Sequence, residues 1–92
     1  MNVQLRYYAQ VRQAAGTEDE TAAVAPGTDV VDALRAAASL HGDAFRDLVL
    51  AGDGQLRASI IVLVNSVPVR RGSRRELAEG DEVSVFSPVA GG

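Results

Sequence analysis

The residues of this sequence that could take part in chemistry lie at its carboxyl end, where two glycines follow a proline-containing segment. Gly91 and Gly92 come directly after Pro88-Val89-Ala90, and the last group is the α-carboxylate of Gly92. Proline cannot donate to a sheet, so a preceding strand is expected to end there. Glycine adopts backbone angles closed to other residues, which lets such a segment enter a narrow channel. The sequence predicts a projecting tail with a reachable carboxylate; the alternative is an ordinary unstructured terminus.

The amino-acid composition of the chain excludes several kinds of active site. Cysteine is absent, which removes disulfides, thiolate nucleophiles and cysteine-based metal sites. All nine basic residues are arginine, so a Schiff-base lysine is excluded as well. The single histidine, His41, falls near the predicted end of a helix. A structural role is expected for it, because no partner for proton transfer can be named.

Length and charge predict one small domain of ordinary globular composition. The chain has 92 residues, 47% of them hydrophobic and 23% charged. It has neither an apolar run of membrane-spanning length nor a signal-peptide pattern, so no membrane association and a cytoplasmic location are expected. A net charge of −3 argues against nucleic acid as a partner.

Apolar patterning predicts strands at residues 2–8, 18–25, 59–65 and 82–87. The run at 59–65 is continuously apolar and mostly β-branched in its middle, which predicts a central strand covered on much of both faces. A short segment follows it, and there Pro68 is compatible only with a sheet edge or a bulge. In the last strand, Val83 and Val85 are expected to face the core, while Phe86 faces the other way.

The main predicted helix covers residues 30–41, where apolar residues recur at spacings of three and four. A short helical turn or wide loop is expected at 9–15, and Asp43 is expected to cap a second short helix. These elements predict an α+β domain, a small mixed sheet with one main helix packed across it. The domain is expected to span 1–87, with 88–92 as the tail.

Two aromatic residues mark a candidate docking surface. Tyr8 and Phe86 both fall on the face of their strands opposite the core residues, where an aromatic is uncommon on a lone monomer. Pro68 and Val67 are expected to extend this surface. The alternative is that loops or the second helix cover both rings as ordinary core.

An arginine cluster lies shortly before the last strand. Arg70, Arg71, Arg74 and Arg75 surround a glycine and a serine, a composition typical of a solvated loop. The same cluster could instead steer an acidic partner toward the domain. The pattern alone leaves both interpretations open.

Three stretches together resemble the ubiquitin-like MoaD/ThiS sulfur-carrier family, most closely its molybdopterin branch. They are residues 7–12 (Tyr-Tyr-Ala-Gln-Val-Arg), residues 77–83 (Leu-Ala-Glu-Gly-Asp-Glu-Val) and, most specifically, residues 86–92 (Phe-Ser-Pro-Val-Ala-Gly-Gly). The resemblance covers nearly the whole chain and implies the β-grasp fold. In that fold the first and last strands are neighbours, so Tyr8 and Phe86 would meet near the root of the tail.

The resemblance also implies an activity that needs partner proteins. A ubiquitin-activating-type adenylyltransferase would use ATP and Mg²⁺ to adenylate the Gly92 carboxylate, and sulfur would then replace AMP to give a thiocarboxylate. In the molybdopterin branch, the sulfur passes to a pterin precursor inside the large synthase subunit, within a heterotetramer. Gly91 would supply flexibility, and the partner contacts implied are those of Tyr8, Phe86, Pro68 and the segment Pro88-Val89-Ala90. The chain itself would bind no cofactor and would not be catalytic alone.

The sequence leaves the pathway open. Ser87 stands where the molybdopterin branch usually has a second proline, and residues 42–57 are slightly expanded. A carrier for cysteine, thiamine or tRNA sulfuration would need the same tail. A protein modifier joined through Gly92 to lysines of target proteins, or a plain interaction module with an irrelevant tail, are further alternatives.

Overall fold

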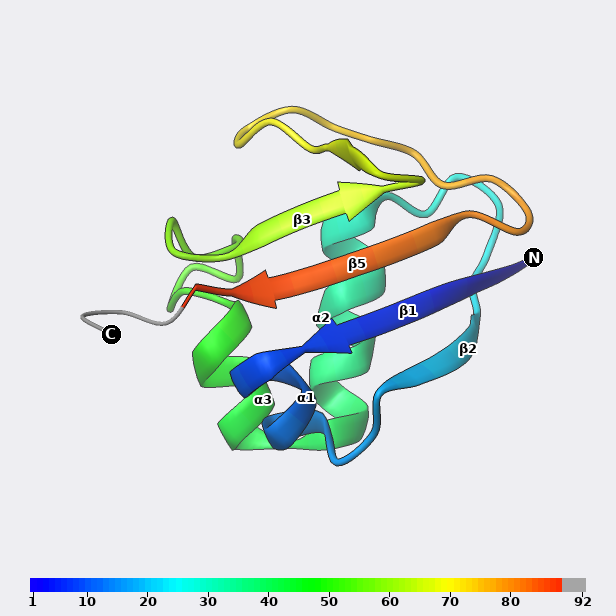
Figure 1. The fold of residues 1–92 in the computed structure, drawn as a ribbon. Coiled ribbons are helices and arrows are strands. Elements are labelled where there is room, and N and C mark those ends of the chain that lie inside the picture. The colour runs from blue at the N-terminus through cyan, green and yellow to red at the C-terminus, as the bar shows by residue number, and fades with distance from the viewer. Residues whose placement is uncertain (89–92) are drawn as a thin grey trace.

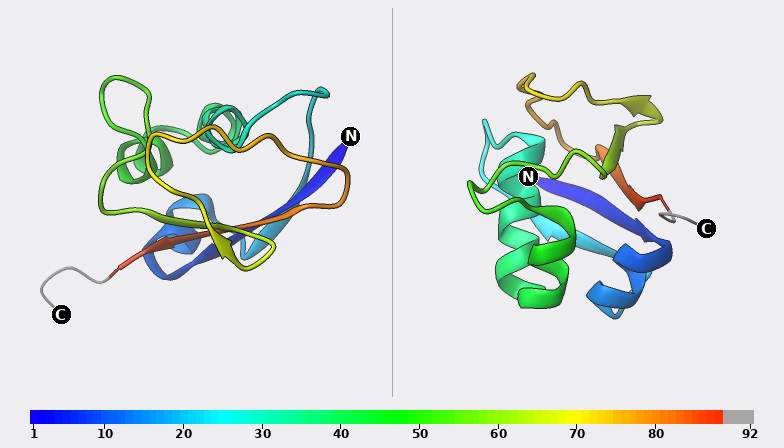
Figure 2. Two further views of the ribbon diagram at one scale, coloured as in Figure 1. Left: turned by 90° about the horizontal axis from the view of Figure 1, so that it is seen from above. Right: turned by 90° about the vertical axis from the view of Figure 1, so that its left-hand side faces the viewer.

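The structure, a computed structural model, describes residues 1–88. Within them, one five-stranded sheet carries helices on one of its faces (Figures 1 and 2). The strands are β1 (Asn2–Tyr8), β2 (Asp19–Ala23), β3 (Ile61–Val64), β4 (Val67–Pro68) and β5 (Glu82–Ser87). The helices are α1 (Ala9–Ala15), α2 (Val30–His41) and α3 (Asp43–Val49). The predicted mixed sheet crossed by one main helix is confirmed.

The sheet has the strand order β2-β1-β5-β3-β4, with β1 and β5 parallel and every other pair antiparallel. The expectation that the run at 59–65 forms a central strand covered on both faces is wrong. The centre belongs to β5, and β3 alternates, with Val62 buried and Ile61 48% exposed. The Ile61 side chain faces away from the helices and is open to solvent, so a β-branched residue at this position reflects the preference of such residues for strands and not burial on both faces.

The core lies between the sheet and α2. Five small or aliphatic residues of this helix are buried: Val30, Ala33, Leu34, Ala37 and Ala38. They pack with Val83 and Val85 of β5, both fully buried as predicted, and with Leu77 from the segment before β5. The alanines let the helix approach the strands closely, which fixes the sheet as a rigid platform.

The helix ends follow from local chemistry, with one correction. The Asp29 side chain accepts a hydrogen bond from the Asp32 amide and caps α2. Asp43 does not cap α3, because it already lies in the first turn and its carboxylate instead contacts Arg46 at 2.6 Å. Gly42, whose φ of 97° favours glycine, occupies the cap position between the two helices.

Parallel pairing of β1 and β5 decides where the chain leaves the domain. Both strands run in the same direction, so their carboxyl ends meet at one edge of the sheet. A further bridge joins Ala9 to Ser87 just beyond the ladder. The tail therefore begins beside the turn from β1 into α1, at the end of the sheet opposite to the N-terminus (Figure 1).

Candidate functional site at the root of the tail

The predicted meeting of the two outward aromatic residues is confirmed. Tyr8 and Phe86 are opposite each other in the β1–β5 register, and their rings stack with centroids 4.4 Å apart and planes inclined by 5°. Both side chains are only partly buried, and neither belongs to the core cluster. Stacked aromatic pairs contribute about 0.5–1.5 kcal/mol beyond the area they bury. The rings therefore fix each other's position while leaving apolar surface exposed.

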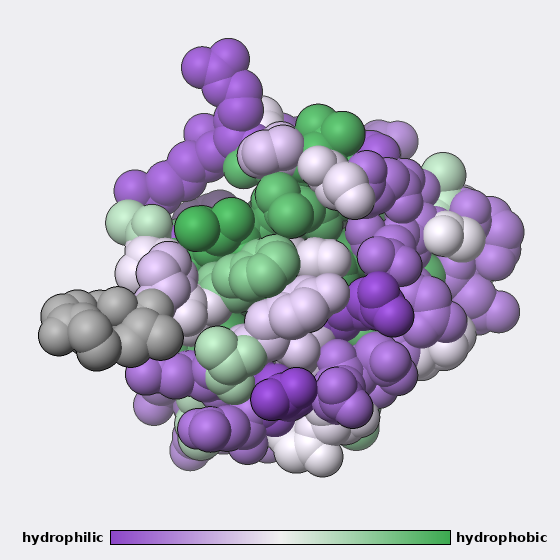
Figure 3. Space-filling view, in the orientation of Figure 1, coloured by the Kyte–Doolittle hydropathy of each residue, from purple (hydrophilic) through white to green (hydrophobic). Residues whose placement is uncertain are grey.

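Apolar residues continue from this pair across β3 to β4. Ile61 lies opposite Phe86, and Leu63, one step along the same face, lies opposite Pro68. Ile61 is exposed, Leu63 partly buried and Pro68 exposed. Figure 3 shows pale and green surface over β3 and β5 on this side of the molecule. We call this surface the apolar half-face; its members are Tyr8, Phe86, Ile61, Leu63 and Pro68.

Val67 does not belong to this surface by register. It is 64% exposed, but it pairs with Val64, whose buried side chain points to the helix side of the sheet. Paired residues share a face, so Val67 stands at the edge on the other side. The expected extension by Pro68 is confirmed, and the one by Val67 is wrong.

The apolar half-face covers one half of the sheet face that points away from the helices, which we call the outer face. The other half of the outer face is polar. Arg6 forms an ion pair of 3.6 Å with Glu82, and Gln4 donates through Nε2 to Thr21 Oγ1 at 2.6 Å. Gln4 is opposite Glu82 in the register, and Arg6 is opposite Ser84. Ser84 also lies opposite Leu63 and so marks the boundary between the two halves.

The last described residues hold the root of the tail against α1. Ser87 is buried, and its hydroxyl donates to Oε1 of Gln10 at 3.4 Å. Pro88 follows immediately, is exposed, and ends β5 as predicted. The remaining predicted tail residues, Val89, Ala90, Gly91 and Gly92, lie outside the described residues. The apolar half-face and the start of the tail therefore adjoin each other.

A turn at the far end of β5 fixes the strand that carries Phe86. Asp81 Oδ2 accepts from the Ala78 amide at 2.8 Å, and its Oδ1 accepts from Asn65 Nδ2 at 2.9 Å. These two hydrogen bonds, and more weakly the Arg75 guanidinium 3.7 Å away, hold the pKa of the Asp81 carboxyl below its usual range against the opposing effect of burial. The turn within residues 77–83 thus has a positioning role.

His41, for which a structural role is expected, has a partner residue that the sequence did not reveal. Its Nε2 lies 2.5 Å from Oε2 of Glu20, and the Tyr7 hydroxyl donates to the same oxygen. Burial, and then the hydrogen bond to Glu20, raise the pKa of the Tyr7 phenol. This cluster joins β1, β2 and the end of α2, on the helix side of the sheet and so on the face opposite to the apolar half-face.

Among residues 1–88, no group of His, Asp or Glu side chains is arranged to hold a metal ion. None of the helices in that span is long and apolar enough to cross a bilayer. What the arrangement offers is a rigid apolar surface beside the start of the tail.

Comparison with known proteins agrees with this arrangement. The sequence model of the ThiS family matches residues 5–92. The chain is 37% identical to the small archaeal modifier protein 3 of Haloferax volcanii and 27% identical to the molybdopterin synthase sulfur carrier subunit of Chlamydomonas reinhardtii, with the whole of both chains covered in each case. The crystal structure of SAMP1 from Haloferax volcanii superposes with a TM-score of 0.88 at 32% identity, again over the whole of both chains. The fold is the ubiquitin-like β-grasp, and the chain belongs to the ThiS family of ubiquitin-like sulfur carriers.

Proposed function

We propose that this protein carries sulfur as a thiocarboxylate on Gly92 and that the apolar half-face is the surface by which partner enzymes hold it. The observation that carries the proposal is the stacked pair of Tyr8 and Phe86, placed where the chain leaves the sheet toward its two glycines. Carriers of this family act with partner enzymes and not alone. A fixed apolar surface beside the tail suits that mode of action, because a docked partner receives the tail in a defined direction.

The chemistry follows from the terminal carboxylate. One carboxylate oxygen attacks the α-phosphorus of ATP, pyrophosphate leaves, and a mixed anhydride with AMP forms. A hydrosulfide equivalent from a sulfur donor then attacks the carbonyl carbon, and AMP leaves with the original oxygen. The product is a thiocarboxylate at Gly92. ATP and Mg²⁺ belong to the activating enzyme, a ubiquitin-activating-type adenylyltransferase, and this chain contributes the carbonyl and the docking surface.

Each residue of the tail has its own part in this proposal. Pro88 ends the strand, Val89 and Ala90 set the reach, and Gly91 with Gly92 pass through a channel too narrow for side chains. An additional residue after Gly92 would move the reacting carbonyl away from the nucleotide. Activation is therefore expected to be lost on such an extension. If the tail had no function, the extension would leave the function of the protein unchanged.

The acceptor we favour is the pterin precursor of the molybdenum cofactor, bound in the large subunit of molybdopterin synthase as part of a heterotetramer. The molybdopterin synthase sulfur carrier subunit of Chlamydomonas reinhardtii, similar along its whole length, supports this pathway. Deletion of the gene should then abolish molybdoenzyme activity in the source organism. Auxotrophy for cysteine or thiamine, or loss of tRNA thiolation, with molybdoenzymes intact would assign the sulfur to another acceptor.

A second function, protein modification, is favoured by the greater identity to small archaeal modifier protein 3. Here the activated Gly92 would form an isopeptide bond with a lysine of another protein. Lysine-linked chains of this protein on itself are excluded, because its sequence contains no lysine. Adducts that disappear on deletion of Gly92 would demonstrate this activity.

The position of the last arginine determines how such adducts can be detected after digestion with trypsin. The last arginine is Arg75, so trypsin would leave residues 76–92 on a modified lysine. An Ala90→Arg variant would shorten that remnant to Gly-Gly. Mass spectrometry of cells carrying this variant, compared with the same variant lacking Gly92, would separate a modifier from a carrier used only for sulfur.

A further inference from the structure

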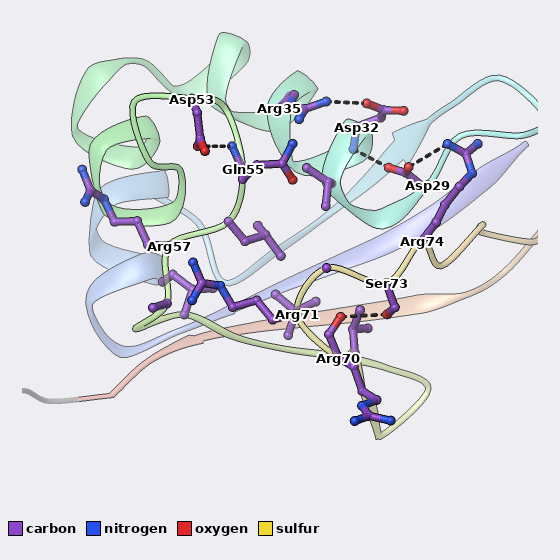
Figure 4. A pocket seen from close by; sticks show the side chains of 17 residues that line it. Asp29, Asp32, Arg35, Asp53, Gln55, Arg57, Arg70, Arg71, Ser73 and Arg74 are labelled. Carbon is purple, nitrogen blue, oxygen red and sulfur yellow. Dashed lines mark hydrogen bonds and ion pairs between the residues drawn. The ribbon is translucent and has the colours of Figure 1, made fainter.

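A cleft with an apolar floor lies on the helix side of the sheet, away from the apolar half-face. It has a volume of about 840 Å³ and is bounded by α2, by the loop that follows α3 and by the loop that follows β4 (Figure 4). Its floor consists of aliphatic side chains, those of Leu56, Ile60, Val62 and Val69. Because successive residues of a strand point to opposite faces, Val62 faces this cleft while Ile61 belongs to the apolar half-face.

Two arginines build the walls of the cleft. Arg35 of α2 donates to the Gly54 carbonyl and to Asp32, both at 2.8 Å, and so ties one loop to the helix. Arg74 donates to Asp29 at 3.0 Å and to the Gly27 carbonyl at 2.9 Å, which ties the other loop to the start of α2. Because each of these two arginines is already paired with a carboxylate, both hold the loops in place and are not free to bind an anionic ligand.

Three further arginines line the cleft without a matching charge, against one lining carboxylate that forms no ion pair among residues 1–88, that of Asp53, which accepts from the Gln55 amide. Among residues 1–88, no carboxylate lies within 4.0 Å of the guanidinium groups of Arg57, Arg70 and Arg71. The Arg57 side chain donates its Nε to the Asp47 carbonyl at 2.5 Å. Figure 4 shows the Arg71 side chain directed toward the Arg57 side of the cleft, while Arg70 turns away. The predicted arginine cluster therefore consists of two kinds of residue. Arg74 and Arg75 form ion pairs within the domain, whereas Arg70 and Arg71 form none among residues 1–88.

We propose that this cleft docks an extended acidic segment of a partner protein. Its carboxylates would meet Arg57 and Arg71, and its apolar side chains would cover Leu56 and Val69, the two members of the floor that are only partly buried. A small inorganic anion would satisfy the guanidinium groups and leave the floor bare, whereas alternate side chains of an extended peptide satisfy both. The proposal goes beyond sulfur transfer, since it uses neither the tail nor the apolar half-face, and both surfaces can be occupied at once.

The test uses the full-length protein and a fluorescent peptide of alternating glutamate and leucine, with binding followed by polarisation. Two control peptides replace every glutamate by glutamine or every leucine by serine. We expect the Glu-Leu peptide to bind in preference to both controls, with affinity falling as salt rises. The double variant Arg57→Gln/Arg71→Gln should bind about tenfold more weakly.

A matched variant separates the cleft from net charge. Arg12→Gln/Arg46→Gln removes the same charge from arginines that do not line the cleft, and it should leave the affinity within about twofold. Equal weakening by the two double variants would overturn the proposal, as would absence of Glu-Leu peptide binding or equal binding of the glutamine peptide. Displacement of the peptide by inorganic tripolyphosphate, with the serine peptide bound equally well, would show a simple anion site and would also overturn it.

Discussion

The two halves of the outer sheet face are built by the same strands and yet carry opposite chemistry. Near the start of β1 and β5, the outward residues are polar and include Gln4 and the ion pair of Arg6 with Glu82. Near the ends of the same strands, Tyr8 stacks on Phe86. The polar half shows that this sheet needs no apolar outer surface to hold its strands together. We therefore propose that the apolar half-face, which begins beside the root of the tail and continues across β3 to Pro68, serves binding and is not needed for folding.

The largest effect is expected from placing the same charge in each half. Phe86→Arg should weaken binding to the activating enzyme about a hundredfold, because a buried aromatic anchor at the centre of an interface contributes most of its energy. Gln4→Arg makes the matching change in the polar half and should alter the affinity by less than about threefold. Isothermal titration calorimetry with the activating enzyme measures both. Similar losses from the two variants would remove the distinction between the halves.

Successive residues of β3 sharpen the comparison by separating binding from stability. Val62 is 4% exposed and Ile61 48%. Val62→Thr buries an unpaired hydroxyl and should lower the free energy of unfolding by about 2 kcal/mol. Ile61→Thr should leave stability nearly unchanged and reduce partner affinity about fivefold. Urea denaturation and calorimetry on both variants check this, and a loss of stability in Ile61→Thr would place that residue in the core.

The turn at the polar end of β5 should affect stability without affecting binding. The folded state lowers the pKa of Asp81 from 3.8, so its contribution to stability is present above that value and is lost as the pH falls through the lower folded pKa. Asp81→Asn should cost about 1–2 kcal/mol at pH 7 and make the stability less dependent on pH below about 4. Denaturation midpoints from pH 2 to 7 provide the measurement. An unchanged acid dependence would show that the carboxylate is not the group responsible.

The smallest effect concerns Tyr7, on the helix side of the sheet and outside both halves. Its pKa is raised in the folded state, so its contribution to stability is complete below about pH 10, the pKa in the unfolded chain, and is lost as the pH rises above it. Tyr7→Phe should cost about 1 kcal/mol at neutral pH and reduce the loss of stability at alkaline pH. Thermal unfolding from pH 8 to 11 tests this, and partner affinity at neutral pH serves as the control.

Much of the fold and of the candidate site followed from alternation along single strands. The inward positions of Val83 and Val85, the outward positions of Tyr8 and Phe86, and the edge position of Pro68 all depend on local geometry that the sequence displays. Their meeting in space required the strand order, which came from the family resemblance. Alternation within one strand predicts the face on which a residue lies, whereas the strand order is needed to predict which residues meet across neighbouring strands.

The features that sequence reasoning missed depend on contacts between distant segments. Ile61 and Leu63 were assigned to a strand covered on both faces, because a continuous apolar run does not tell which face a helix will cover. Glu20 and His41 are 21 residues apart, and nothing local pairs them. Arg74 and Arg71 belong to one polar loop, and the positions of Asp29 and Glu76 separate an engaged arginine from one without a matching carboxylate.

The central claim is that the apolar half-face serves a tail whose carboxylate becomes a thiocarboxylate. The direct measurement is the intact mass of the full-length protein after incubation with its activating enzyme, ATP, Mg²⁺ and a sulfur donor. The proposal predicts a gain equal to the difference between one sulfur and one oxygen atom, located on Gly92 by fragmentation and absent when one residue is added after Gly92. An unchanged mass, under conditions in which the enzyme activates a known carrier of the family, would contradict the account.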